Sequence, residues 1–246
     1  MSIESQSDLD GLKRAGKVCR LVIDAMKQSV RAGVTTLELD RIGAEIMRQH
    51  GARSAPKLVY GFPGHSCISV NDEIVHGVPG QRRLLPGDMV KLDVTVEVGG
   101  YMADACETLV IVPVQSLQAG LMDCAREAFQ AGLQRVRPGT RAYEVGESVA
   151  REVARSGYSV VRDLCGHGIG RTIHEPPTIP NFRDVRCHAV LTEGLVFTIE
   201  PIIAAGGPRT VTKRDGWTVR TRDRSLSAHY EQTVVVTSQG AMLLTA

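Results

Sequence analysis

The chain has 246 residues, of which 43% are hydrophobic and 23% are charged, a balance typical of an ordinary globular enzyme of one domain. The formal net charge of +2 argues against an extended nucleic-acid or membrane surface, and no apolar run reaches the roughly 18 residues of a membrane-spanning helix. The N-terminus lacks the pattern of a signal peptide, so we expect the six scattered cysteines to be reduced thiols of a cytoplasmic protein.

The first predicted element is a helix over residues 7–31. Apolar side chains recur at helical spacing from Leu12 onward. Ser7 with Asp10 resembles a capping box that would begin this helix, and Gly33 would follow its end.

A second helix is predicted to begin at Thr35, which would form a capping box with Glu38, and to end at Gly51. From about residue 58 to 112 the chain changes to β-branched residues and turns, which indicates strands. Within this region we expect a hairpin around the two glycines at 99–100.

The same pattern then returns in the second part of the chain. Residues 30–51 can be laid on 136–157 at an offset of 106, residues 67–79 on 165–177 at 98, and residues 86–93 on 193–200 at 107. Three matches in the same order predict two repeated halves, approximately 7–112 and 117–240, each with two helices followed by strands. No low-complexity linker separates them, so we expect one catalytic domain with a shared core over 1–246.

The first hairpin would bring two carboxylates together. With a two-residue turn, Asp93 lies opposite Cys106, and Asp104 falls two residues away on the same face. Thr95 would lie opposite Asp104 and could donate a hydrogen bond to it. The alternative is that Asp93 belongs to a solvated strand face, because polar and apolar residues alternate along 91–97.

Two further carboxylates lie in apolar surroundings. Glu200 is enclosed in "GLVFTIEPII", and Glu231 comes shortly before "TVVVT". A buried carboxylate without a partner costs several kcal/mol, so each is expected to bind a cation. Four such groups would repel one another as bare charges, whereas two divalent ions such as Mn²⁺, Fe²⁺, Co²⁺ or Zn²⁺ would hold them together. A metal pair about 3.5–4 Å apart can also activate a bridging water.

The histidines of "DLCGHGIGRTIHEPP", residues 163–177, are the best candidates for nitrogen ligands. His167 lies between Gly166 and Gly168, which permit close backbone approach, so we predict it to be a metal ligand. His174 is predicted to face the reacting atoms. A surface or structural role in polar surroundings is expected for four other histidines: His50, His65, His188 and His229.

With these residues in place, the chain resembles the type I methionine aminopeptidases over about residues 8 to 240. The resemblance rests on "NDEIVHGVP", "KLDVTVEVGGYMADACETLV", "GHGIGRTIHEPP", "VFTIEP" and "TRDRSLSAHYEQTVVVT". It implies an α/β protein with the pita-bread fold, in which two αβ halves related by pseudo-twofold symmetry surround a central antiparallel sheet. The chain looks like the short bacterial form, without a zinc-binding N-terminal extension or the large insertion of type II enzymes.

The resemblance also implies the chemistry. The metal ligands would be Asp93, Asp104, His167, Glu200 and Glu231. Asp104 and Glu231 would bridge the two ions, and a hydroxide activated by them would attack the peptide bond after the initiator methionine when the second residue is small. Glu200 would carry the proton to the leaving amine, while His76 and His174 would contact the substrate.

The pocket for the methionine side chain is expected to combine aromatic and thiol groups, which suit a thioether. Its members would be Tyr60, Phe62, Cys67 and Trp217, with His76 at the edge. Two positions depart from the family pattern. Val59-Tyr60-Gly61 stands where Tyr-His-Gly is frequent, and Ile173 stands where Phe is common.

Two other functions share some of these features. Xaa-Pro aminopeptidases and prolidases have the same fold and ligands but usually carry a large N-terminal domain. A peptide- or ribosome-binding relative without catalysis would typically have lost metal ligands. The expected partners are a peptide substrate and, at most weakly, the ribosome. We expect no specific nucleic acid, no membrane partner and a monomeric chain.

Overall fold

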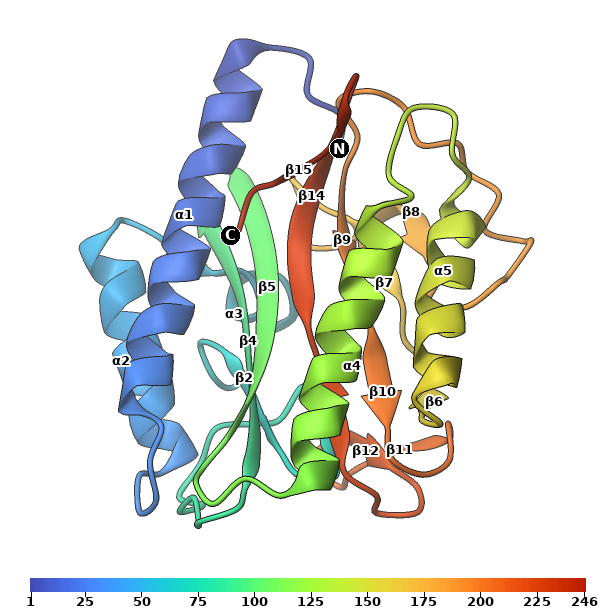
Figure 1. Cartoon of the computed structure of the whole chain (residues 1–246). Coiled ribbons are helices and arrows are strands. Elements are labelled where there is room, and N and C mark those ends of the chain that lie inside the picture. Colours follow the sequence, from blue (N-terminus) through green and yellow to red (C-terminus); the bar gives the residue numbers. More distant parts are fainter.

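Five helices and fifteen strands follow one another along the chain in the computed structural model, which describes residues 1–246 (Figure 1). The helices are α1 (Gln6–Ser29), α2 (Thr36–Gln49), α3 (Ala55–Tyr60), α4 (Ser116–Leu133) and α5 (Ala142–Arg155). The strands are β1 (Arg53–Ser54), β2 (Cys67–Val70), β3 (Glu73–Val75), β4 (Met89–Val98), β5 (Tyr101–Val110), β6 (Ser159–Val160), β7 (Gly166–Gly168), β8 (Glu175–Ile179), β9 (Val196–Ile199), β10 (Ile202–Ala204), β11 (Thr210–Thr212), β12 (Val219–Thr221), β13 (Ser227–His229), β14 (Glu231–Thr237) and β15 (Gly240–Leu243). None of the five helices combines the length and apolar character needed to cross a bilayer.

The N-cap of helix α1 lies two residues earlier than predicted. The expected capping box of Ser7 with Asp10 is wrong, because Ser5 is the N-cap and its hydroxyl accepts a hydrogen bond from the backbone N–H of Asp8. The carboxylate of Asp8 in turn accepts from the Ser5 hydroxyl and from the backbone N–H of Glu4. This reciprocal arrangement satisfies donors that a helix start leaves free.

The second helix begins as predicted, whereas a third one was not foreseen. The capping box of Thr35 with Glu38 is confirmed at the start of α2. The short helix α3 occupies the point where the sequence predicts only strands and turns. Ser54 caps it, Pro56 lies in its first turn, and Gly61 ends it with a φ of 71°. Six residues are too few for the helical period to be visible in the sequence.

The strands form one large curled sheet and two small ones. The order in the nine-stranded sheet is β1-β4-β5-β14-β9-β7-β8, with β15 paired to β14 and β2 paired to β4. The two three-stranded sheets have the orders β13-β10-β6 and β11-β12-β3. Helix α1 packs on β4 and β5, while α4 contacts β9 and α5 contacts β8, so each helix pair covers its own part of the large sheet (Figure 1).

The predicted register of the β4–β5 hairpin is confirmed. Asp93 pairs with Cys106, and Thr95 pairs with Asp104 across a turn of two glycines that both have positive φ. The alternative of a solvated strand face is wrong, because Lys91 on the same face is only 1% exposed. Strand β13 lies against this face, where Lys91 Nζ donates to the carbonyl oxygen of Ser227 at 3.0 Å, so the burial of its polar groups depends on the second half of the chain.

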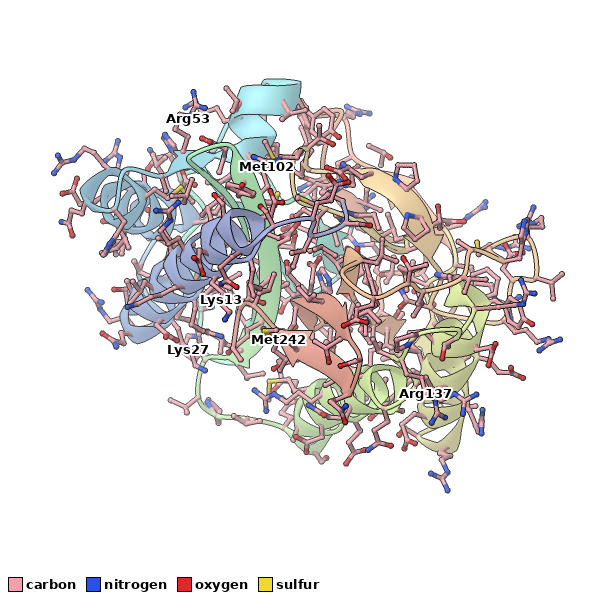
Figure 2. The ribbon with its side chains drawn as sticks, turned by 90° about the horizontal axis from the view of Figure 1, so that it is seen from above. Lys13, Lys27, Arg53, Met102, Arg137 and Met242 are labelled. Carbon is pink, nitrogen blue, oxygen red and sulfur yellow. The ribbon has the colours of Figure 1, made fainter.

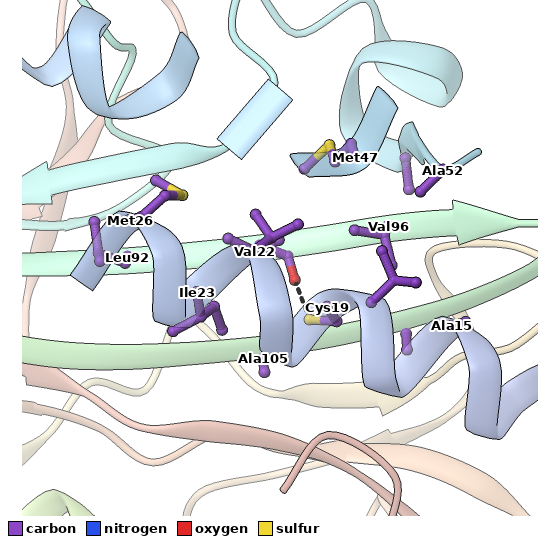
Figure 3. Close-up of a cluster of buried hydrophobic side chains, with 14 of the residues drawn as sticks. Ala15, Cys19, Val22, Ile23, Met26, Met47, Ala52, Leu92, Val96 and Ala105 are labelled. Atoms are coloured by element: carbon purple, nitrogen blue, oxygen red, sulfur yellow. Dashed lines mark hydrogen bonds between the residues drawn. The ribbon is translucent and has the colours of Figure 1, made fainter. Parts of the chain in front are cut away.

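The opposite face of the hairpin carries the main apolar core. Helix α1 buries one stripe of side chains against it: Leu12, Ala15, Cys19, Val22, Ile23 and Met26 (Figure 3). The thiol of Cys19 donates to the carbonyl of Val94 at 3.0 Å (Figure 3). Each large aliphatic side chain fully buried here contributes roughly 1.5–3 kcal/mol. The charged side chains of Lys27, Arg53 and Arg137 lie at the periphery (Figure 2).

The two helix pairs correspond to each other in detail. The offset of 106 residues relates the bounds of α2 to those of α5. Both are followed by a glycine with positive φ, Gly51 at 64° and Gly157 at 73°. The two parts of the sheet meet where β5 pairs with β14, with Glu231 opposite Cys106. This seam places side chains from distant parts of the sequence within reach of one another.

Candidate active site

A cavity of about 170 Å³ lies on the face of the large sheet that points away from α1. All eleven site residues predicted from the sequence line it: Tyr60, Phe62, Cys67, His76, Asp93, Asp104, His167, His174, Glu200, Trp217 and Glu231. The lining also includes Ile173 and His229. The structure therefore gathers the predicted residues into a single site.

Four carboxylates converge in this cavity from three strands and a strand end. Asp93 lies on β4, Asp104 on β5, Glu200 directly after β9, and Glu231 at the start of β14. Burial, together with the neighbouring carboxylates, raises the pKa of Asp93, Asp104 and Glu200 well above its ordinary value. Burial raises the pKa of Glu231 from 4.5 to about 8. Such carboxylates stay ionised at neutral pH only if a cation compensates their charge.

The donor atoms fit divalent metal ions. Asp104 Oδ1 and Glu231 Oε1 are buried and have no hydrogen-bond partner. Potential ligand atoms lie within 4.8 Å of one another in two groups: Asp104, His167 and Glu231 form one, and Glu200, His229 and Glu231 form the other. Glu231 belongs to both. Carboxylate oxygens with neutral imidazoles are donors that divalent transition metals accept.

The glycines around His167 have a packing reason. Strand β7 is enclosed between β8 and β9, and a Cβ on Gly166 would lie 2.4 Å from the carbonyl oxygen of Thr198. A Cβ on Gly168 would lie 2.2 Å from the carbonyl oxygen of Pro176. Only glycine permits this approach, which allows the imidazole between them to enter the cavity from a strand.

His167 is oriented by its backbone neighbour. Its Nδ1 lies 3.0 Å from the carbonyl oxygen of Gly168. When Nδ1 donates this hydrogen bond, the lone pair of Nε2 is free, and Nε2 lies 3.6 Å from Glu200 Oε1. Burial and the neighbouring His174 lower the pKa of His167 to about 4, so the ring is neutral at pH 7. A neutral imidazole is the form that binds a metal.

Two threonines form hydrogen bonds with the predicted ligands. The hydroxyl of Thr198 donates to Glu200 Oε1 at 3.1 Å and accepts from the backbone N–H of His167 at 3.1 Å. Thr233 donates to the carbonyl oxygen of Asp104 and accepts from its backbone N–H, both at 2.8 Å. These bonds fix the relative positions of three predicted ligands that come from different strands.

His174 and Tyr60 form the outer wall. Tyr60 Oη and His174 Nδ1 are hydrogen-bonded at 2.5 Å, and the rings of His167 and His174 lie with centroids 4.2 Å apart. Burial lowers the pKa of His174. When Tyr60 donates its O–H to Nδ1, the other ring nitrogen carries the proton and can donate it to a substrate atom. The sequence gives no sign of this pair, because 114 residues separate its members.

The predicted pocket for a methionine side chain forms next to this wall. The rings of Phe62 and Trp217 meet edge to face with centroids 5.3 Å apart. Cys67 on β2 pairs with Asp93 on β4, which places the thiol beside the carboxylates. Ile173 is buried and adds an aliphatic surface. Aromatic and soft groups therefore lie directly beside the polar centre.

His76 reaches the cavity through an uncommon backbone conformation. Its φ is 56°, in the left-handed region that few residues with a Cβ adopt. The residue is partly open to solvent, but desolvation of its ring within the cavity, then the neighbouring His174 and His229, lower the pKa of His76 to about 4. Strained conformations of this kind are found at functional sites, where the surrounding structure holds them.

The expectation for His229 needs correction. The structure places this residue in the cavity wall at 2% exposure, whereas His50 and His188 are exposed and His65 contacts Asp40. Its Nε2 lies 3.3 Å from Glu231 Oε2 and 3.9 Å from Glu200 Oε2. A sequence signal was available, because His229 lies only two residues before the predicted ligand Glu231, although the two residues belong to different strands, β13 and β14.

Comparisons with known proteins agree on one family. The sequence pattern of metallopeptidase family M24 matches residues 10–238. Methionine aminopeptidase 2 of Bacillus subtilis is 38% identical, and the match covers 100% of this chain and 99% of the relative. The crystal structure of methionine aminopeptidase from Rickettsia prowazekii superimposes with a TM-score of 0.95 at 36% identity and covers 100% of both chains. The crystal structure of methionine aminopeptidase from Thermotoga maritima superimposes with a TM-score of 0.96 at 33% identity. The match covers 100% of this chain and 99% of that chain.

Proposed function

Because the chain belongs to metallopeptidase family M24 and, as a methionine aminopeptidase with the pita-bread fold, removes N-terminal methionine, we propose that two divalent metal ions are held in its cavity by Asp93, Asp104, His167, Glu200 and Glu231. The observation that carries this proposal is the pair of ligand groups that share Glu231. One ion would leave part of these buried donors without a partner. The identity of the ions is open to Co²⁺, Mn²⁺, Fe²⁺ or Zn²⁺, since this donor set suits each of them.

The metals, when bound, supply a Lewis acid for the peptide carbonyl and lower the pKa of an attacking water. Side chains of the protein are proposed to transfer the proton and to bind the substrate. Glu200 is proposed to take the proton released by the water and to pass it to the leaving amine. Glu200 is suited to this role because it is buried, with 8% of its surface exposed, and lies beside His167. The hydroxyl of Thr198 donates a hydrogen bond that holds its Oε1 in place.

His174 is proposed to stabilise the negative charge that develops on the carbonyl oxygen. The hydrogen bond with Tyr60 at Nδ1 supports this role, because it leaves the opposite nitrogen as the donor. His76, which also lines the cavity, is proposed to hydrogen-bond the scissile amide. Replacing either histidine by Ala is expected to lower kcat more than it raises KM, by roughly 100-fold or more.

Specificity is proposed to come from the size and chemistry of the cavity. The methionine side chain would lie against Phe62, Trp217, Tyr60 and Cys67, where sulfur–aromatic contacts contribute about 0.3–1.5 kcal/mol. A second substrate residue would enter the narrow part of the cavity, which residues of both halves line, so only small residues would be accepted. The free amine of the substrate would bind near the carboxylates, and a formylated methionine would not be cleaved.

The test is the release of free methionine from synthetic peptides by the metal-loaded chain. We expect Met-Ala-Ser to be cleaved, and Met-Lys-Ser and formyl-Met-Ala-Ser to be resistant. Exhaustive chelation should abolish the activity, and Co²⁺ or Mn²⁺ should restore it. Full activity after chelation would refute the metal proposal, while preferential cleavage of an Xaa-Pro dipeptide would favour the prolidase-like alternative.

We further propose that the chain acts as a single catalytic domain and a monomer in the cytoplasm, with at most weak contact to the ribosome. Six cysteines that are all free thiols support a reducing compartment. The seam between β5 and β14 supports a single domain, because ligands from both sides of it meet in one cavity.

A further inference from the structure

His229 is an enclosed imidazole to which the five-residue ligand set gives no role. It ends β13 and is 2% exposed. Neither Nδ1 nor Nε2 has a hydrogen-bond partner. A buried polar group without a partner costs roughly 1–3 kcal/mol, so an orphaned ring of this kind indicates a partner that binds from the cavity.

The ring is aimed at two carboxylates. Nε2 lies 3.3 Å from Glu231 Oε2 and 3.9 Å from Glu200 Oε2. This group mirrors the one formed by Asp104, His167 and Glu231. Each group contains one imidazole, and Glu231 is common to both. The structure thus holds two overlapping groups of possible ligand atoms that share one carboxylate.

The separations suit coordination to a common ion. Donors bound at about 2.1 Å lie about 3.0 Å apart at a right angle and about 3.4 Å apart at the tetrahedral angle. The 3.3 Å between His229 and Glu231 falls in this interval, and the 3.9 Å to Glu200 requires a wider angle.

The backbone holds the ring in this position. The hydroxyl of Thr108 accepts from the N–H of His229 at 2.9 Å and donates to its carbonyl oxygen at 2.7 Å. Ile202 pairs with His229 between β10 and β13. Both sides of the residue are therefore fixed by neighbouring strands, as metal ligands require.

We infer that His229 is a further nitrogen ligand of the metal centre, and that it binds the ion held by Glu200 and Glu231. The inference rests on the proposed two-ion site and deepens it. The metal centre then has two imidazole ligands, His167 and His229.

The experiment counts imidazole ligands directly in the full chain. The protein is stripped with a chelator and loaded with Co²⁺, and proton NMR records the paramagnetically shifted, solvent-exchangeable imidazole N–H signals. Calorimetry with Co²⁺ and with Mn²⁺ gives stoichiometry and affinity. We expect two ions and two shifted signals in the wild type. His229→Gln, which keeps a polar side chain without an imidazole, should lose one signal and weaken one binding step 10-fold or more.

The matched control is His188→Gln, which changes an exposed histidine and should behave as the wild type. Two bound ions with only one shifted signal in the wild type would overturn the inference while leaving the two-ion function intact. Uptake of fewer than two ions would instead contradict the proposed function. The wild-type signal count does not depend on the folding of any variant, so the inference can be refuted even if His229→Gln is unstable.

Discussion

Glu231→Gln should stabilise the metal-free protein and weaken the metal-loaded one. Without metal, burial raises the pKa of Glu231 from 4.5 to about 8. Below pH 4.5 the carboxyl is protonated in both the folded and unfolded chains, and its ionisation then has no effect on stability. Between pH 4.5 and 8 the unfolded chain loses the proton while the folded chain keeps it, so the free energy of unfolding falls as pH rises.

The size of the effect follows from the shift. At about 1.4 kcal/mol per pKa unit, the wild type should lose about 3.5 kcal/mol relative to Glu231→Gln between pH 5 and pH 8. The histidines with lowered pKa, His76, His167 and His229, act in the opposite direction, because their unfolded forms bind protons below pH 6.5. His76 and His167 contribute in both proteins, whereas His229 lies with its Nε2 3.3 Å from Glu231 Oε2 and is affected by the substitution, so the figure of about 3.5 kcal/mol counts the ionisation of Glu231 alone.

The assay is urea unfolding of chelator-treated wild type and Glu231→Gln at pH 5, 6.5 and 8, repeated with saturating Mn²⁺. Glu193→Gln, the same substitution at an exposed position, serves as the matched control. With Mn²⁺ the order should reverse, since the substitution would remove a proposed ligand that belongs to both groups of possible ligand atoms. A metal-free difference that stays constant within about 0.5 kcal/mol from pH 5 to pH 8 would refute the reasoning.

Three further substitutions test the surroundings of the site. Thr198→Val removes the hydroxyl that positions the ligands, and calorimetry should show Mn²⁺ binding weakened 10–100-fold; unchanged affinity would remove Thr198 from the site. Tyr60→Phe deletes the hydrogen bond to His174, so steady-state kinetics should show a lower kcat with little change in KM, and a change in KM alone would contradict this. Gly168→Ala places a Cβ 2.2 Å from a carbonyl oxygen and should lower Tm severely, whereas Gly80→Ala, with open space around it, should not; equal Tm values would disprove the packing argument.

Much of the site could be predicted because its residues follow strand geometry. The hairpin register put Asp93 and Asp104 on one face from a two-residue turn alone, and the apolar flanks of Glu200 and Glu231 implied a buried charge. These arguments depend on a local repeat of two residues and on the cost of burying a carboxylate, both of which are readable in a single sequence.

What could not be predicted depends on contacts between distant segments. The hydrogen bond of Tyr60 with His174 joins a short helix to the start of β8, and neither local sequence requires it. The burial of His229 depends on the packing of β13 against β10. The start of α1 was misplaced because Asp8 can act as a cap partner as well as a helical residue, and the sequence alone does not choose between Ser5 and Ser7.

The seam between β5 and β14 has a consequence for the lifetime of the folded chain. Asp104 and Glu231, which the proposed site joins through shared ions, are 127 residues apart in sequence, and they contact only when the two halves have docked. The bonds between bound metal and these ligands would therefore have to break before the halves can separate. This lowers the rate of unfolding more than it raises the rate of folding. A protease that cuts only transiently opened chains should therefore degrade the metal-loaded protein slowly and the chelator-treated protein quickly.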